Sequence, residues 1–145
     1  MKVRVIWVGK TREKYIKEGI NKYIKLISPF CKLECIEIKD SMEKDKERSL
    51  KKEGERILKT SPGFVLLQET GKEMSSVQFS EFLRKSGGGD FVIGGAYGVS
   101  GEVAEKASST ISLSKMTFTH DMIRIIFMEQ IYRALTILNK RGYHH

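Results

Sequence analysis

Hydrophobic and polar positions along the chain follow two alternating periods. Val3 to Val8 is a nearly continuous apolar run, which predicts a strand buried on both faces. Between Glu13 and Ile27 the apolar residues recur at helical spacing with lysines between them, and Ser28-Pro29 ends the pattern. Leu33 to Ile38 then alternates in a way that predicts a second strand.

The same alternation continues to the C-terminus. The further strands that we predict span 64–67, 91–93 and 110–113, and the further helices span 41–59, 75–84, 102–107 and 121–141. The segment Gly87-Gly88-Gly89-Asp90 predicts a flexible break. Strands that alternate with helices predict an α/β fold, in which a parallel-type sheet is flanked by helices, and we expect residues 1–145 to form a single domain.

The last predicted helix is apolar around most of its circumference. From Met122 to Leu138, 12 of the 17 residues are apolar, Ala or Tyr. One face of such a helix can pack on the sheet, and in a chain this small we expect the other face to pack on a second subunit. The pattern therefore favours a two-fold homodimer.

Charge is distributed unevenly along the chain. Residues 1–60 carry 17 Lys and Arg against 10 Asp and Glu, a net charge of +7, whereas residues 61–145 carry 9 against 8. A basic half indicates a polyanionic partner such as nucleic acid, although a solvated surface explains the charge equally well.

Composition also bears on location and on metal binding. The apolar runs are too short to span a membrane and the N-terminus resembles a strand rather than a signal peptide, so we expect a cytoplasmic protein with no membrane partner. On a strand, Cys31 and Cys35 would lie about 13 Å apart, too far for a disulfide or a shared metal ion. We expect two half-buried free thiols and no metal site.

A glycine-rich segment at 94–98 is the first of three that could carry chemistry. It follows a predicted strand, where open α/β sheets bind ligands, and its glycines would let a ligand lie against the backbone. A plain tight turn explains the pattern equally well. The segment lacks the GxGxxG spacing and the acidic residue that follows it in dinucleotide sites, which excludes a nicotinamide enzyme.

The other two segments flank the last helix. Residues 113–120 connect a strand to this helix, and free backbone groups in such a loop suit the edge of an adenine ring. The tail at 141–145 places aromatic and basic groups at a free terminus, where they can stack on a flipped-out base. Taken separately, an ordinary strand–helix connection and a frayed or tag-derived end are the simpler explanations.

Taken together and in this order, the segments resemble the ribosomal large-subunit RNA methyltransferase H family, within the knotted SPOUT class. The resemblance extends over nearly the whole chain. Six family motifs are matched in order. They are VGK at 8–10, KEGxxIL at 52–58, IGGxxG at 93–98, LSKMTFxH at 113–120, RxxxxEQxYRA at 124–134 and a terminal YH at 143–144.

The resemblance implies a deep trefoil knot in the C-terminal part, S-adenosylmethionine held in its bend, and dimers in which one subunit's tail covers the other's cofactor site. The implied activity is methylation of N3 of a pseudouridine in 23S rRNA, on the assembled 70S ribosome. Motif matching assigns cofactor binding to Leu67, Gly95, Leu113, Ser114, Lys115, Met116, Thr117 and Phe118. It assigns handling of the target base to Tyr143 and His144; we expect His144 to accept the N3 proton, with Tyr143 as a relay.

The chain departs from the family at two positions. Thr119 stands where the family commonly has Pro, which only pre-sets φ at a helix start. His145 stands where the family commonly has Lys or Arg, so no cation is expected there near neutral pH. The competing interpretation is a non-enzymatic, basic RNA-binding or ribosome assembly factor. It explains the charge of residues 1–60 but not the glycine turn or the loop at 113–118.

Overall fold

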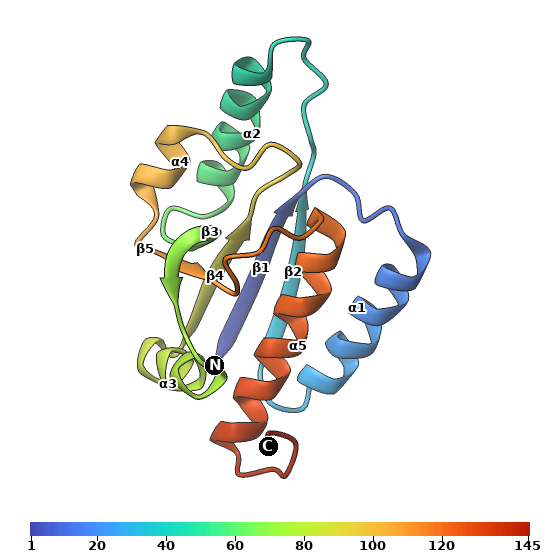
Figure 1. Ribbon diagram of the computed structural model, residues 1–145, viewed down its shortest axis with the longest axis vertical. Coiled ribbons are helices and arrows are strands. Elements are labelled where there is room, and N and C mark those ends of the chain that lie inside the picture. The colour runs from blue at the N-terminus through green and yellow to red at the C-terminus, as the bar shows by residue number, and fades with distance from the viewer.

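Five parallel strands form one sheet in the computed structural model, in the order β2-β1-β4-β3-β5 (Figure 1). The strands are β1 (Lys2–Val8), β2 (Lys32–Ile38), β3 (Val65–Glu73), β4 (Gly88–Ile93) and β5 (Ser109–Ser112). The helices are α1 (Lys14–Ile27), α2 (Lys46–Thr60), α3 (Ser76–Ser86), α4 (Gly101–Lys106) and α5 (His120–Leu138). The predicted α/β class with a parallel sheet is therefore confirmed.

Helices cover both faces of this sheet. Val3 and Val5 of β1 belong to a core cluster with α1, α3 and α5, whereas Ile6 and Val8 belong to a second cluster with α2 and α4. Figure 1 shows α1 and α5 side by side on one face and α2 and α4 on the other. The continuous apolar run of β1 follows from this arrangement, because side chains on both faces of the strand are buried.

Three predicted boundaries are corrected by the structure. The second helix begins at Lys46 rather than 41, because the Asp45 side chain accepts a hydrogen bond from the Glu47 N–H at 3.0 Å and caps it. The last helix ends at Leu138, and the residues after it turn back on themselves. The predicted flexible break is wrong: β4 begins at Gly88, where a Cβ would overlap the Lys2 carbonyl of the paired strand β1.

Both cysteines are free thiols, as predicted. Cys31 is buried and Cys35 half-buried, and burial raises the pKa of both, to about 11 for Cys35. No group of three or more His, Cys, Asp or Glu side chains could hold a metal ion. Among the helices, none combines the length and the apolar composition needed to cross a bilayer.

Candidate functional site

A cavity of about 560 Å³ lies at the carboxyl ends of β4 and β5 and beside the middle of β3. This is the edge at which open α/β sheets bind ligands, and the volume falls in the usual range for small-molecule sites. Three segments supply its walls: the middle of β3, the turn after β4 and the loop between β5 and α5. The lining residues are Leu67–Thr70, Ile93–Ala96, Gly98, Leu113, Ser114, Met116–His120 and Ile123.

The turn after β4 is closed by a hydrogen bond from the Gly98 N–H to the Gly95 carbonyl at 3.0 Å. Gly98 has a φ of +78°, and a Cβ at Gly94 would come within 2.7 Å of the Gly98 carbonyl group. The nearest atom to a Cβ at Gly95 would be in the Val8 side chain, at 3.4 Å, an ordinary van der Waals contact. The turn itself therefore requires glycine at 94 and 98, whereas Gly95 lines the cavity without that constraint.

The middle of β3 bulges out of the sheet beside this turn. Leu67 pairs with Ile111 of β5, and so does Lys72 after a shift in register. The residues between them leave the ladder, and Glu69 accepts a hydrogen bond from the Thr117 hydroxyl of the opposite wall at 3.0 Å. The prediction ended this strand at Leu67 and missed the bulge, although polar residues directly after an apolar strand were a usable signal.

The β5–α5 loop forms the third wall through short local hydrogen bonds. The Ser114 N–H donates to Ser112 Oγ at 3.2 Å, and the Met116 N–H donates to Ser114 Oγ at 2.9 Å. The Met116 side chain stays 74% exposed and that of Phe118 37% exposed. Large apolar side chains left open at a cavity suit a flat apolar group such as a purine.

The structure gathers most of the residues predicted for the cofactor. Seven of the eight line the cavity, namely Leu67, Gly95, Leu113, Ser114, Met116, Thr117 and Phe118. Lys115 is exposed and is not part of the wall. Tyr143 and His144 follow the C-terminal end of α5 and fold back onto Glu129 and Arg133, which lie roughly 9 and 15 Å along the helix from the cavity residue Ile123. The sequence motifs thus occupy two separate places in one subunit.

Buried polar contacts fix the first turn of α5 beside the cavity. The Asp121 carboxylate accepts hydrogen bonds from the backbone N–H groups of Arg12 and Glu13 at 2.9 and 2.8 Å. Arg124 is completely buried and donates to the Thr11 hydroxyl and the Val8 carbonyl at 2.9 and 2.7 Å. Burial lowers the pKa of Arg124 while Asp121 opposes that shift. These contacts hold α5 against the carboxyl end of β1.

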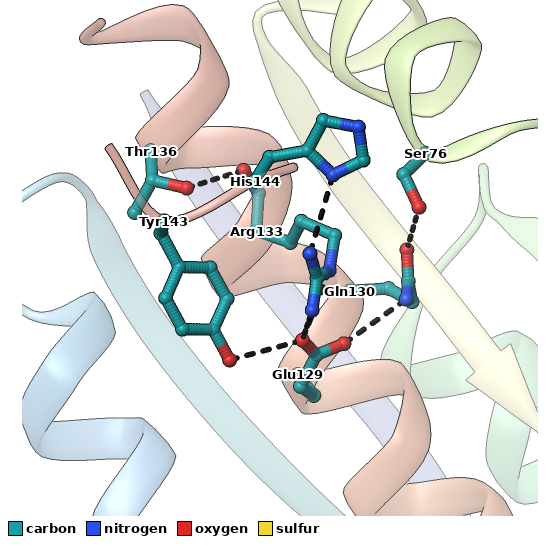
Figure 2. A network of polar contacts seen from close by, with 7 residues as sticks. All are labelled: Ser76, Glu129, Gln130, Arg133, Thr136, Tyr143 and His144. Atoms are coloured by element: carbon teal, nitrogen blue, oxygen red, sulfur yellow. Dashed lines mark hydrogen bonds and ion pairs between the residues drawn. The ribbon is translucent and has the colours of Figure 1, made fainter. Parts of the chain in front are cut away.

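The tail packs against the second half of α5 through a second polar network (Figure 2). The Tyr143 hydroxyl donates to Glu129 at 3.1 Å, and Arg133 donates to the same carboxylate oxygen at 3.0 and 2.5 Å. Arg133 also contacts the His144 ring nitrogen Nδ1 at 3.2 Å. Burial and the hydrogen bond to Glu129 raise the pKa of Tyr143 to about 12. The predictions missed Glu129 and Arg133 as part of this site, although both stand in the matched motif.

The fold and the cavity together define a class: a small α/β protein with a cavity at a glycine turn, at the edge where open α/β sheets bind ligands. A family model described as "Predicted SPOUT methyltransferase" matches residues 1–144. The chain belongs to the SPOUT methyltransferase family. This confirms the resemblance seen in the sequence and the enzyme class, and membership implies a methyl donor.

Curated relatives match over almost the full length of both chains. The protein is 46% identical to "Ribosomal RNA large subunit methyltransferase H" of Thermodesulfovibrio yellowstonii, over 98% of this chain and 97% of the relative. It is 47% identical to the protein of that name in Trichlorobacter lovleyi, over 100% of both chains. The solved structure of a probable methylase family protein from Haemophilus influenzae Rd KW20 shares the fold, with a TM-score of 0.59 and 11% identity over 99% of this chain and 70% of that one.

Proposed function

We propose that this protein transfers a methyl group from S-adenosylmethionine to N3 of a pseudouridine in 23S rRNA of the large ribosomal subunit. The observation that carries the proposal is the cavity, which collects seven of the eight cofactor residues expected from the motifs. Relatives that match end to end are named as methyltransferases of large-subunit ribosomal RNA. The basic first 60 residues would contact the RNA backbone.

The cavity fits the proposed cofactor chemically. Leu67, Leu113 and Phe118 offer apolar walls to the adenosyl group. The glycine turn and the tightly turned loop offer backbone groups to the edge of adenine. S-Adenosylmethionine supplies a methyl group activated by its sulfonium charge. The residues of this chain therefore have to bind, orient and exclude water rather than create a reactive group.

In the proposed transfer, N3 of the base forms a bond to the methyl carbon. The bond between that carbon and sulfur breaks, its electron pair stays on sulfur, and the N3 proton leaves to water. Tyr143 and His144 would contact the base during this step. Within one subunit the tail contacts Glu129 and Arg133, and none of its residues lines the cavity, so its docked position does not serve that cavity.

We therefore propose a homodimer in which the partner's tail completes each cavity. Exposed apolar side chains in the β5–α5 loop and the first turn of α5, such as Phe118 at 37% and Met122 at 36%, give the second subunit a surface to cover. Assembly of this kind would place the tail of one protomer over the bound cofactor of the other. The trefoil knot implied by the resemblance stays a prediction of the same proposal. The expected place of action is the cytoplasm, where ribosomes are found.

A methylation assay tests the proposal. Purified protein and methyl-labelled S-adenosylmethionine are incubated with 70S ribosomes or with isolated subunits, and the product is mapped by mass spectrometry. The expected product is one methylated pseudouridine in 23S rRNA, formed on 70S ribosomes. Calorimetry with S-adenosylmethionine, with and without RNA, is the companion measurement. Binding of RNA without any binding of S-adenosylmethionine would favour the non-enzymatic RNA-binding factor instead.

A further inference from the structure

The contact between Arg133 and His144 has a fixed direction. Arg133 Nη1 lies 3.2 Å from His144 Nδ1, and a guanidinium carries only donors. Nδ1 must therefore accept, and the single ring hydrogen of the neutral imidazole lies on Nε2. Figure 2 shows the ring with Nδ1 toward Arg133 and the other nitrogen directed away from the network.

Arg133 cannot easily turn away from this contact. Its Nε and Nη2 both donate to one oxygen of Glu129, four residues earlier on α5, at 3.0 and 2.5 Å. The other Glu129 oxygen accepts from Gln130 at 3.0 Å, and Gln130 accepts from the Ser76 hydroxyl of α3 at 2.7 Å. The guanidinium also lies 4.8 Å from the centre of the Tyr143 ring. Such a connected network holds the donor in place.

We propose that Arg133, anchored by Glu129, is a positioning residue that sets the tautomer of His144, and that His144 donates its Nε2 hydrogen to a carbonyl oxygen of the target base. The inference rests on the proposed function and specifies the role of His144 within it. His144 becomes a hydrogen-bond donor in place of the proton acceptor expected from the sequence.

The chemistry of the target base suits a donor. N3 of pseudouridine lies between two carbonyl groups, so loss of its proton spreads negative charge onto both oxygens. A fixed N–H aimed at one of these oxygens stabilises that charge as it develops, in the manner of an oxyanion hole. The N3 proton passes to a water or hydroxide from solvent. Tyr143 does not compete for it, because its own hydroxyl donates to Glu129.

Magnetic resonance reads the tautomer without substrate. In protein labelled with ¹⁵N-histidine, long-range proton–nitrogen spectra show which ring nitrogen of His144 carries hydrogen; its signals are identified by their loss in His144→Gln. We expect hydrogen on Nε2 in the wild type and in Arg84→Met, which removes a comparable arginine bound to Glu81 on α3. Arg133→Met should give a mixture of tautomers. Hydrogen on Nδ1, or an unchanged tautomer without Arg133, would overturn the proposal.

Turnover separates a donor from a base. Glutamine places an amide N–H near the position of Nε2, asparagine places one near Nδ1, and neither can accept a proton as imidazole does. We expect His144→Gln to retain about tenfold more turnover than His144→Asn or His144→Ala, with equal affinity for S-adenosylmethionine. Arg133→Lys should keep more turnover than Arg133→Met, with KM unchanged. Equal losses in the three His144 variants would overturn the proposal.

If the wild type itself fails to methylate, the proposed function is wrong, whereas the tautomer of His144 is still measured. The two failures are therefore distinguishable.

Discussion

The two ends of α5 are built in different ways. At its first turn, the cavity is made largely of backbone: a glycine turn, a strand bulge and a loop closed by short hydrogen bonds. From its middle onward, the site is made of charged and polar side chains around Glu129 (Figure 2). A backbone-built site can bind a common cofactor through its shape, whereas a network of side chains can orient single hydrogens on a reacting base. One helix thus carries binding at one end and positioning at the other.

The same helix carries Arg124 near its start and Arg133 in its second half, and the largest expected contrast is in the free energy of unfolding that each arginine contributes. Arg124 is completely buried, whereas the Arg133 side chain is 25% exposed. Arg124→Met leaves Asp121 in the interior without its cation and should lower the free energy of unfolding by about 3–5 kcal/mol. Arg133→Met should lower it by about 1 kcal/mol or less.

Urea denaturation followed by circular dichroism measures both variants. Equal losses for the two arginines would show that the contrast between the two ends of the helix does not hold for stability.

The next effect concerns turnover and tests whether the two ends work across a dimer. Ala96→Trp places an indole at the rim of the cavity and should abolish cofactor binding. His144→Ala should keep its affinity for the cofactor, while its turnover falls about a hundredfold or more. A mixed dimer holds one intact cavity facing one intact tail. After subunit exchange, the mixture should recover about a quarter of wild-type turnover, because half of the dimers are mixed and each has one complete site of two.

The control is a mixture of two cavity variants, Ala96→Trp with Gly94→Trp, which should stay inactive. Recovery there, or none in the first mixture, would contradict a site shared between subunits. A protein that is active while light scattering shows it to be a monomer would also contradict a shared site.

The difference between the two ends also explains what the sequence could and could not predict. The α/β class and most of the cavity followed from local patterns, since apolar strands ending in glycine or loop residues mark the ligand edge of a sheet. The bulge after Leu67 could not be predicted from local patterns, because it depends on the pairing of β3 with β5 resuming at Lys72. The break predicted near Gly88 failed for a similar reason: only the neighbouring strand β1 shows why glycine is needed there.

The tail was predictable only as a motif. Tyr143 and His144 are close to Glu129 because the chain reverses after Leu138, and no periodicity in the sequence indicates that reversal. The direction of the hydrogen bond between Arg133 and His144 likewise needed coordinates. The knot and the subunit pairing depend on how distant segments pass one another, so they stay predictions from the resemblance.

The smallest expected effect is the alkaline titration of Tyr143, which reports on the tail alone. Burial and the hydrogen bond to Glu129 raise its pKa from the ordinary value of 10.0 to about 12. Because the folded state favours the protonated phenol, the contact stabilises the docked tail fully below about pH 10 and loses that contribution as the pH rises through about 12. The ultraviolet absorbance of tyrosinate, compared between wild type and Tyr143→Phe, isolates this one group among five tyrosines. Tyr15→Phe, at a side chain 62% exposed, is the matched control. A titration midpoint of Tyr143 near pH 10 would mean that the tail is undocked from Glu129 in solution. Only the cavity of the partner subunit could then hold the tail in place.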